Sequence, residues 1–130
     1  MIDVKSIKTQ IEAQIAKPAN DVSIIELVDL VVEYAYITRA SDIHIEPAVD
    51  KVIIRFRIDG ILHDVFLLVK ELQSEVISRI KVLSGLKTDI HHIPQDGRFK
   101  VKLEDANEID VRVSIAPTFY GENTVMRLLA

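Results

Sequence analysis

Arginines recur on the polar side of segments in which apolar and polar residues alternate. Such segments predict β-strands, because successive side chains of a strand point to opposite faces of a sheet. A guanidinium stays charged and can hold phosphate oxygens through two hydrogen bonds, so this series suits an anion presented from outside. The alternative is that these arginines pair with acidic neighbours and are merely solvated. The arginines concerned are Arg55, Arg57, Arg98, Arg112 and Arg127, and the acidic candidates are Asp59, Asp96, Glu108 and Asp110.

Other residue patterns that could do chemistry are incomplete. His44 and Glu46 share one face of an expected strand, but no His-Glu-x-x-His helix accompanies the 4 histidines, so no metal site is predicted. Ser41, Asp42 and His44 have the residue types of a hydrolase triad without a Gly-x-Ser-x-Gly elbow. Ser41 and Asp42 are therefore expected to shape the turn into the strand through hydrogen bonds to its backbone.

The glycines and cysteines exclude two further kinds of site. The 4 glycines lie far apart, so there is neither a phosphate loop nor a Gly-x-Gly-x-x-Gly fingerprint. The chain is not expected to cradle the phosphates of a nucleotide by itself. With no cysteine, it has neither a disulfide framework nor a thiol nucleophile.

Length, charge and hydropathy predict a single soluble domain. The chain has 130 residues, of which 48% are hydrophobic, enough to bury a core. A net charge of −4 argues against a dedicated nucleic-acid binder. No apolar run approaches the roughly 20 residues of a membrane helix, and the first residues do not resemble a signal peptide. We therefore expect a cytoplasmic protein with no nucleic-acid partner.

Three segments show helical spacing of their apolar residues. Residues 4–17 predict a short helix or a linker arm, and residues 1–19 are expected to precede the main domain. Ser23 and Glu26 form a capping box at the start of a helix that extends to about Thr38. The third helix covers residues 71–83 and ends at Gly85, with Arg79 and Lys81 on its exposed face.

The remaining segments predict strands joined by turns. Asp59-Gly60 indicates a hairpin, and Pro94-Gln95-Asp96-Gly97 is interpreted as a tight turn that leads into a strand. Residues 117–121 are expected to form a loop. The resulting prediction is an α+β fold, in which helices pack against a largely antiparallel sheet. The predicted strands cover residues 41–47, 51–59, 61–68, 99–103, 109–115 and 123–129.

Six motifs, in serial order, resemble the secretion ATPases that power type II secretion and type IV pilus assembly. The resemblance covers about residues 20–129, and six ordered motifs make chance agreement improbable. The motifs are Ala40–Pro47, Arg55–Gly60, Ser78–Leu83, Ile93–Arg98, Ile109–Ser114 and Gly121–Leu129.

The resemblance implies a particular part of these ATPases, namely the PAS-like domain, called N2, that precedes the catalytic half. On this reading residues 20–130 are the N2 domain, and the phosphate loop lies downstream, outside this chain. The chain alone is then not an ATPase, and ATP and magnesium are cofactors of the full-length protein only. The resemblance implies that Arg112 and Arg127 reach the γ-phosphate of ATP bound to the catalytic domain, with Arg98 a second-rank phosphate or interface residue.

The resemblance also implies partners and a location. They are the catalytic domain of the same chain, neighbouring subunits of a homohexamer, and secretion or pilus platform proteins of the inner membrane. The protein would then be cytoplasmic and peripheral to that membrane through its partners. Two other functions remain open: a PAS-like sensor that holds a small ligand in the hollow of its sheet, and a protein–protein interaction module whose arginines meet an acidic partner.

Overall fold

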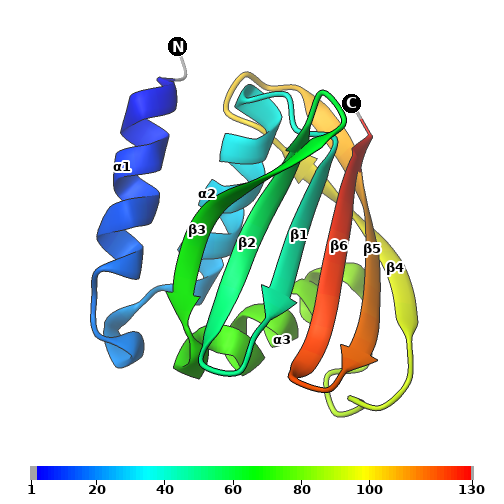
Figure 1. Ribbon diagram of the computed structural model, residues 1–130. Helices are drawn as coiled ribbons and strands as arrows, with labels where there is room; N and C mark the ends of the chain where they lie inside the picture. The colour runs from blue at the N-terminus through cyan, green and yellow to red at the C-terminus, as the bar shows by residue number, and fades with distance from the viewer. Residues whose placement is uncertain (1–2, 130) are drawn as a thin grey trace.

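A single antiparallel sheet organises the molecule in the computed structural model, which describes residues 3–129 (Figure 1). Its 6 strands lie in the order β3-β2-β1-β6-β5-β4, so the first strand of the chain pairs with the last. The strands are β1 (Asp42–Pro47), β2 (Lys51–Ile58), β3 (Ile61–Val69), β4 (Gln95–Lys102), β5 (Glu108–Thr118) and β6 (Gly121–Leu129). The predicted α+β class, with helices against an antiparallel sheet, is confirmed.

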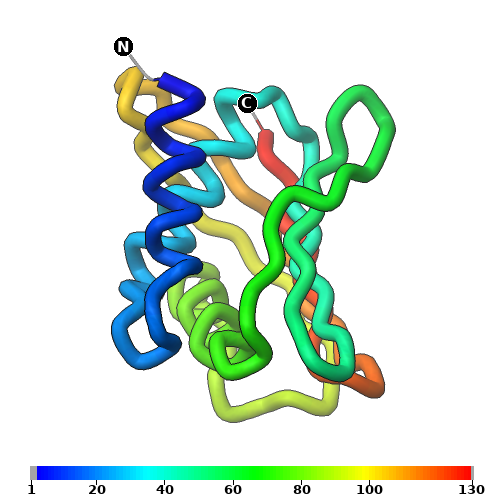
Figure 2. The backbone as a smooth tube through the Cα atoms, turned by 60° about the vertical axis from the view of Figure 1, so that its left-hand side comes forward, coloured from blue at the N-terminus to red at the C-terminus, as the bar shows by residue number. Residues whose placement is uncertain are grey.

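The helices cover one face of the sheet and leave the other open (Figures 1 and 2). Ser23 caps α2 as predicted, because its hydroxyl accepts a hydrogen bond from the Glu26 amide at 3.3 Å. At the other end of the helical layer, α3 stops at Gly85, which adopts the left-handed conformation at φ 70°. The helices are α1 (Val4–Ile15), α2 (Ile24–Ile37) and α3 (Gln73–Ser84), with short 3-10 turns at Ala19–Asp21 and Lys70–Leu72.

The core lies between the sheet and α2 and α3. Most strands bury alternate residues on the helical side, as the sequence pattern predicts, and Ile43, Phe56 and Val111 are almost completely inaccessible to solvent. The exception is β3, whose first four residues are exposed. On α2, the apolar Ile25 is exposed and does not belong to the buried face of the helix.

The first helix belongs to the same core. Figure 2 shows α1 outermost, alongside α2. Its buried residues Ile7 and Ile11 join the core cluster, and the amide of Gln14 donates a hydrogen bond to Glu26 at 3.1 Å. The segment is thus a packed helix, whereas a domain boundary after residue 19 stays a prediction. None of the helices within residues 3–129 has the length and apolar character to cross a bilayer.

One of the predicted connections between strands is confirmed and another differs in the structure. The hairpin at Asp59-Gly60 is confirmed, with φ of 52° and 80° as a type I′ turn requires. In contrast, residues 117–121 are not a loop, because β5 extends to Thr118 and β6 begins at Gly121. Phe119 and Tyr120 form a two-residue connection between them.

The predicted tight turn at Pro94–Gly97 is wrong. Strand β4 already begins at Gln95, so Asp96 and Gly97 pair with β5 as strand residues. The Gln95 side chain instead orders the preceding loop through bonds to the Lys87 amide at 2.9 Å and carbonyl at 3.0 Å. Gly97 serves close packing, because a Cβ added there would lie 2.7 Å from the carbonyl oxygen of Ser84.

Replacing Gly97 by alanine should therefore destabilise the protein. We expect the free energy of unfolding to fall by about 1–3 kcal/mol, since the contact is with backbone at the end of α3 and cannot easily relax. Urea unfolding of Gly97→Ala checks this, with the exposed Lys100→Ala on the same strand as a control that should change by less than about 0.5 kcal/mol. An alanine variant as stable as the wild type contradicts the packing role.

Lys81 is also placed differently from the prediction. The sequence predicts Lys81 on the exposed face of its helix, but in the structure it is completely buried. Its ammonium group donates hydrogen bonds to the carbonyl of Ile90 at 2.7 Å and to the carboxylate of Glu122 at 3.0 Å. His91 Nδ1 lies 2.9 Å from the same carboxylate. The group joins α3, the 86–94 loop and the start of β6.

Candidate functional site

The open face of the sheet brings most of the predicted arginines into one line. Strand pairing sets Arg98 opposite Arg112, Arg112 opposite Arg127, and Arg127 opposite Asp42. Asp42 in turn pairs with Arg57, which lies opposite Leu62. We call these six positions the arginine row. From one edge of the sheet to the other, it consists of Arg98, Arg112, Arg127, Asp42, Arg57 and Leu62.

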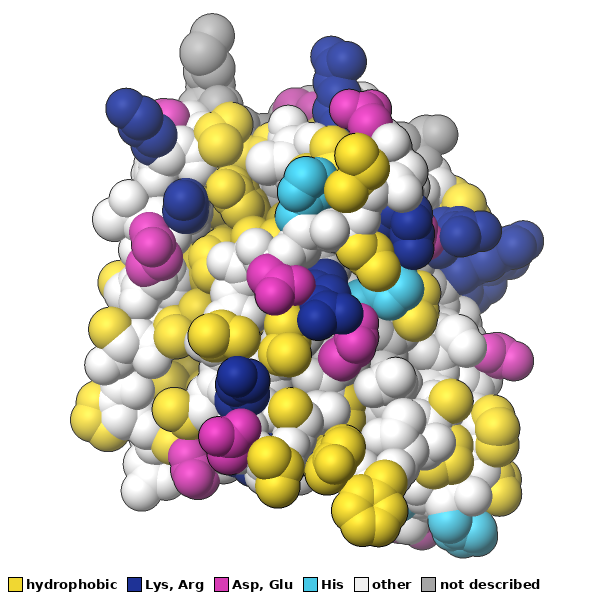
Figure 3. All heavy atoms as spheres, in the orientation of Figure 1, with side chains coloured by type: hydrophobic (Ala, Val, Ile, Leu, Met, Phe, Trp, Pro, Cys, Tyr) yellow, Lys and Arg dark blue, Asp and Glu magenta, His cyan; other side chains and the backbone are white. Residues whose placement is uncertain are grey.

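The row arises from strand alternation combined with register. Most residues of β4, β5 and β6 that face away from the helices are polar, with Val125 and Leu129 among the exceptions. The residues next to the arginines along each strand, Phe99, Val111 and Met126, point into the core. Figure 3 views the open face and shows a group of Lys and Arg side chains at its right-hand edge, with isolated basic side chains among acidic and apolar ones over the rest. The densest group of basic side chains in this view therefore lies toward the edge of the sheet that the last strands of the chain form.

The arginines of the row differ in how their charge is balanced. Arg127 Nε donates a hydrogen bond to Asp42 Oδ1 at 2.8 Å, and Arg57 Nε lies 3.7 Å from Asp42 Oδ2. Within residues 3–129, Arg98 and Arg112 form no ion pair. Because like charges directly opposite each other on adjacent strands repel, this part of the row favours an anion between the two side chains.

The remaining predicted arginines fit the alternative of internal pairing. Arg55 lies 2.7 Å from Asp64 and 3.5 Å from Glu46, and Arg57 Nη1 donates a hydrogen bond to the Gly60 carbonyl at 2.9 Å. The partners are not the acidic residues that the sequence suggested, because register and not proximity along the chain selects them. Arg55 and Arg57 thus link β1, β2 and β3. The capacity to bind an anion lies toward the opposite edge of the same face, over β4, β5 and β6.

A shallow hollow of about 520 Å³ lies along the row where the charge is unbalanced. Arg112 and Arg127, to which the resemblance assigns contact with the γ-phosphate, line it together with Arg98, the second-rank phosphate or interface residue. Its remaining lining residues are Asp96, Gly97, Val113, Ser114 and Val125. The structure therefore brings the predicted site residues together on one open surface, where a phosphate group of another molecule or domain could approach.

Asp42 is the acidic centre of the row. Its side chain is only 3% exposed. Burial acts to raise the pKa of Asp42, but hydrogen bonds from Arg127 and from the Ser41 hydroxyl, with the charge of Arg127, lower the pKa below its usual value. The hydrogen bond to Asp42 and the negative charge of Asp42 in turn raise the pKa of Arg127. Asp42 is therefore ionised at neutral pH.

The contribution of Asp42 to stability should depend on pH. Because the folded-state pKa lies below the unfolded value of 3.8, the contribution is complete above about pH 3.8 and disappears as pH falls through the folded pKa. We expect Asp42→Asn to lower the free energy of unfolding by about 1–3 kcal/mol at pH 7. Urea unfolding from pH 7 to pH 2 should show the difference between the two proteins shrinking below pH 3.8. A difference that stays constant over this range contradicts the assignment.

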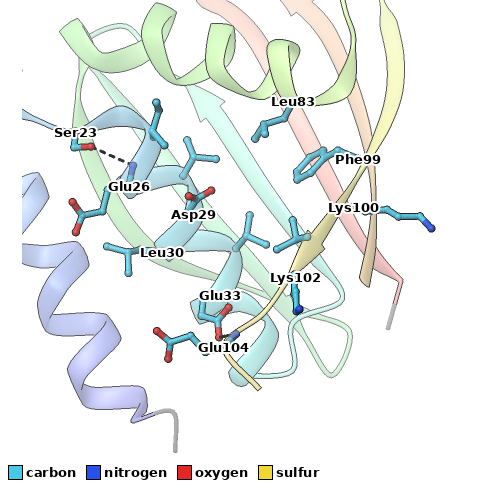
Figure 4. Close-up of a pocket in the computed structure, with 14 residues that line it drawn as sticks. Ser23, Glu26, Asp29, Leu30, Glu33, Leu83, Phe99, Lys100, Lys102 and Glu104 are labelled. Carbon is cyan, nitrogen blue, oxygen red and sulfur yellow. Dashed lines mark hydrogen bonds between the residues drawn. The ribbon is translucent and has the colours of Figure 1, made fainter. Parts of the chain in front are cut away.

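A second hollow, of about 550 Å³, lies between α2 and β4 (Figure 4). Burial raises the pKa of Asp29 and of Glu33 on its α2 side. Phe99 lies beside Leu83 at one end of the hollow, whereas Lys100 points away from it. Its lining residues include the acidic Glu26, Asp29, Glu33 and Glu104 beside Lys100 and Lys102. Because acidic groups outnumber the lysines, this hollow is less suited to a phosphate than the arginine row. No three His, Asp or Glu side chains among residues 3–129 gather as a metal site would require.

Asp42 is the site residue that sequence reasoning missed. The chain pattern placed it on the polar face of its strand, but its part in holding Arg127 depends on the pairing of β1 with β6. The two residues are separated by 85 positions in the chain. The only signal in the sequence is that both lie at outward positions of predicted strands.

Fold and site together define an α+β domain whose open sheet face presents a line of arginines. A model of the type II/IV secretion system protein family matches residues 17–130. The chain belongs to this family, which confirms the resemblance seen in the motifs. It is 41% identical over 128 residues to the type IV pilus assembly ATPase PilB of Myxococcus xanthus, covering 98% of this chain and 23% of that protein.

A second relative and two solved structures are also similar to this chain. The type II secretion system protein E of Xanthomonas campestris pv. campestris is 43% identical over 111 residues, covering 85% of this chain and 19% of the relative. This chain thus spans about a fifth to a quarter of these two relatives. The pilus retraction motor PilT with bound ADP is similar in fold at TM-score 0.54 and 17% identity, over 77% of this chain and 28% of that one. The ATPase DotB of Legionella pneumophila has TM-score 0.56 and 14% identity, over 88% and 31%.

Proposed function

We propose that this domain supplies arginines to the γ-phosphate of ATP bound by the catalytic domain of a hexameric secretion or pilus-assembly ATPase. Arg112 and Arg127 make the contact, and Arg98 lies beside them as a second-rank partner. The observation that carries the proposal is the row itself: three arginines at directly paired positions, of which only Arg127 has an acidic partner among residues 3–129. The names of the relatives supply the chemical identity of the ligand, because PilB is described as an ATPase.

The domain then acts as a nucleotide sensor. ATP in the catalytic domain offers a terminal phosphate, and the guanidinium groups of Arg112 and Arg127 bridge to it and draw the two domains together. Hydrolysis removes that phosphate and releases the contact. The domain has a positioning and regulatory role, and ATP and magnesium are held by the catalytic domain of the full-length protein.

The proposal includes the surroundings of the domain. Its partners are the catalytic domain of its own chain, neighbouring subunits of the hexamer, and platform proteins of the inner membrane. These partners hold the protein at the cytoplasmic side of that membrane. The assignment to the PAS-like N2 domain, which precedes the catalytic domain in the chain, stays part of the proposal.

Turnover of ATP by the full-length protein tests the proposal. Arg112→Ala and Arg127→Ala should each reduce turnover sharply, since an arginine that meets the transferred phosphate contributes about 10³- to 10⁵-fold in GTPases. Near-normal turnover in both variants would contradict the proposal.

The interior of the domain does not favour the alternative of a small-ligand sensor. The cavity enclosed inside the core is distinct from the surface hollow between α2 and β4. It measures about 10 Å³ and is lined by apolar side chains that include Val31, Ile54 and Met126. A metabolite requires a pocket of several hundred Å³ with a few polar groups to orient it. The core described here is filled by its own side chains.

A further inference from the structure

The three neighbouring arginines of the row are not equivalent, and the difference lies in Asp42. Asp42 contacts Arg127 through Nε, and residues 3–129 provide no other hydrogen bond or ion pair for the Arg127 side chain. A guanidinium has five N–H donors in a planar fork. The two terminal amino groups of Arg127 are therefore left for an external acceptor, while its Nε–H is already engaged.

The carboxylate is itself firmly held. The Ser41 hydroxyl donates a hydrogen bond to Asp42 Oδ2 at 3.0 Å, and Arg57 Nε lies 3.7 Å from the same oxygen. The Asp42 side chain is 3% exposed, whereas that of Arg127 is 64% exposed. A buried, fixed acceptor thus anchors one edge of a guanidinium whose other edge faces solvent.

We propose that Asp42 is a positioning residue for Arg127: it binds Nε and presents the terminal amino groups to a polyphosphate oxygen at the arginine row. The inference rests on the proposed function and adds to it the way in which one arginine is prepared. Arg112 has no such anchor within the described part of the chain, so it must be ordered by the anion itself. Holding a flexible side chain in its bound conformation before the ligand arrives removes part of the entropy cost of binding.

The direction of the effect separates positioning from simple electrostatics. Asp42 carries a negative charge beside the anion site, so its neutralisation should strengthen anion binding if charge alone mattered. If Asp42 prepares Arg127, the same substitution weakens binding. Asp64→Asn is the matched control, because Asp64 lies on the same open face and pairs with Arg55 outside the hollow.

The experiment is a titration of the 130-residue chain with inorganic triphosphate, monitored by NMR. We expect Asp42→Asn to weaken binding about 10-fold, the order of one charged hydrogen bond. Asp64→Asn should leave the dissociation constant unchanged or slightly lower it. In the Arg127→Ala background, Asp42→Asn should have no further effect on the dissociation constant. Unchanged or tighter binding in Asp42→Asn overturns the proposal, as does an equal loss in the Arg127→Ala background, which indicates a general structural effect.

A measurement without any anion distinguishes this inference from the proposed function. The Nε–H group of Arg127 should give a protected signal, in slow exchange with water, that disappears in Asp42→Asn, whereas the Nε–H of Arg112 should exchange rapidly in both proteins. Rapid exchange at Arg127 in the wild type overturns the positioning role whatever the titration shows. A protected Arg127 with triphosphate binding that survives Arg112→Ala and Arg127→Ala overturns the phosphate role instead.

Discussion

Loss of the Arg112 side chain is expected to reduce ATP turnover by the full-length protein about 10³-fold or more. Arg112 is exposed in the middle of the unbalanced part of the row, between Arg98 and Arg127. Its charge has no acidic partner among residues 3–129, so it is available to charge that develops on a transferred phosphate. Steady-state hydrolysis with saturating ATP measures the effect on kcat, and the Michaelis constant separates it from ground-state binding.

Two matched variants sharpen this result. Lys100→Ala removes an exposed cation from β4 outside the row and should leave turnover nearly unchanged. Arg112→Lys keeps the charge but loses the bidentate fork, so we expect it to recover only part of the activity. If Lys100→Ala and Arg112→Ala reduce turnover equally, the effect reflects the general positive potential of this face, and the specific role of Arg112 is wrong.

The largest expected effect on stability is at Lys81. Replacing it by alanine leaves the carboxylate of Glu122, whose side chain is 9% exposed, without its ammonium partner. Breaking a buried ion pair from one side typically costs about 3–5 kcal/mol, a large fraction of the stability of a domain this size. The lost bond to the Ile90 carbonyl should loosen the 86–94 loop as well. Urea unfolding at pH 7 gives the free-energy difference.

A double variant tests the cause. Lys81→Met with Glu122→Gln removes both charges and keeps most of the volume, so it should recover much of the stability lost in Lys81→Ala. A single variant that loses less than about 1 kcal/mol, or a double variant no better than the single, contradicts the importance of the pair. Neither substitution touches the open face of the sheet, so Arg112 should keep its environment.

Strand alternation accounts for what the sequence predicts best. The outward positions of Arg98, Arg112 and Arg127, and the inward positions of Phe99 and Val111, follow from a period of two residues. That period does not say which strands are neighbours. The sheet places β1 beside β6, and only this long-range pairing brings Asp42 to Arg127.

The two clearest errors have physical explanations. Pro94-Gln95-Asp96-Gly97 has the composition of a turn, but Gly97 is required by the close approach of Ser84, a tertiary contact that local propensity cannot reveal. Lys81 is predicted on the exposed face of its helix, and lysine is rarely buried. Its burial depends on Glu122, which lies 41 positions further along the chain.

The ladder of hydrogen bonds that fixes the arginine row also limits how the site can change. Arg112 and Arg127 are directly paired residues of adjacent strands, near the middle of a sheet with strands on both sides. Their Cα separation is set by the backbone and cannot open or close without breaking the ladder. The site therefore has no hinge of its own. In the proposed function, engagement and release are then rigid-body rotations of the whole domain, and we expect the residues that control their rate in the segments that join it to its neighbours.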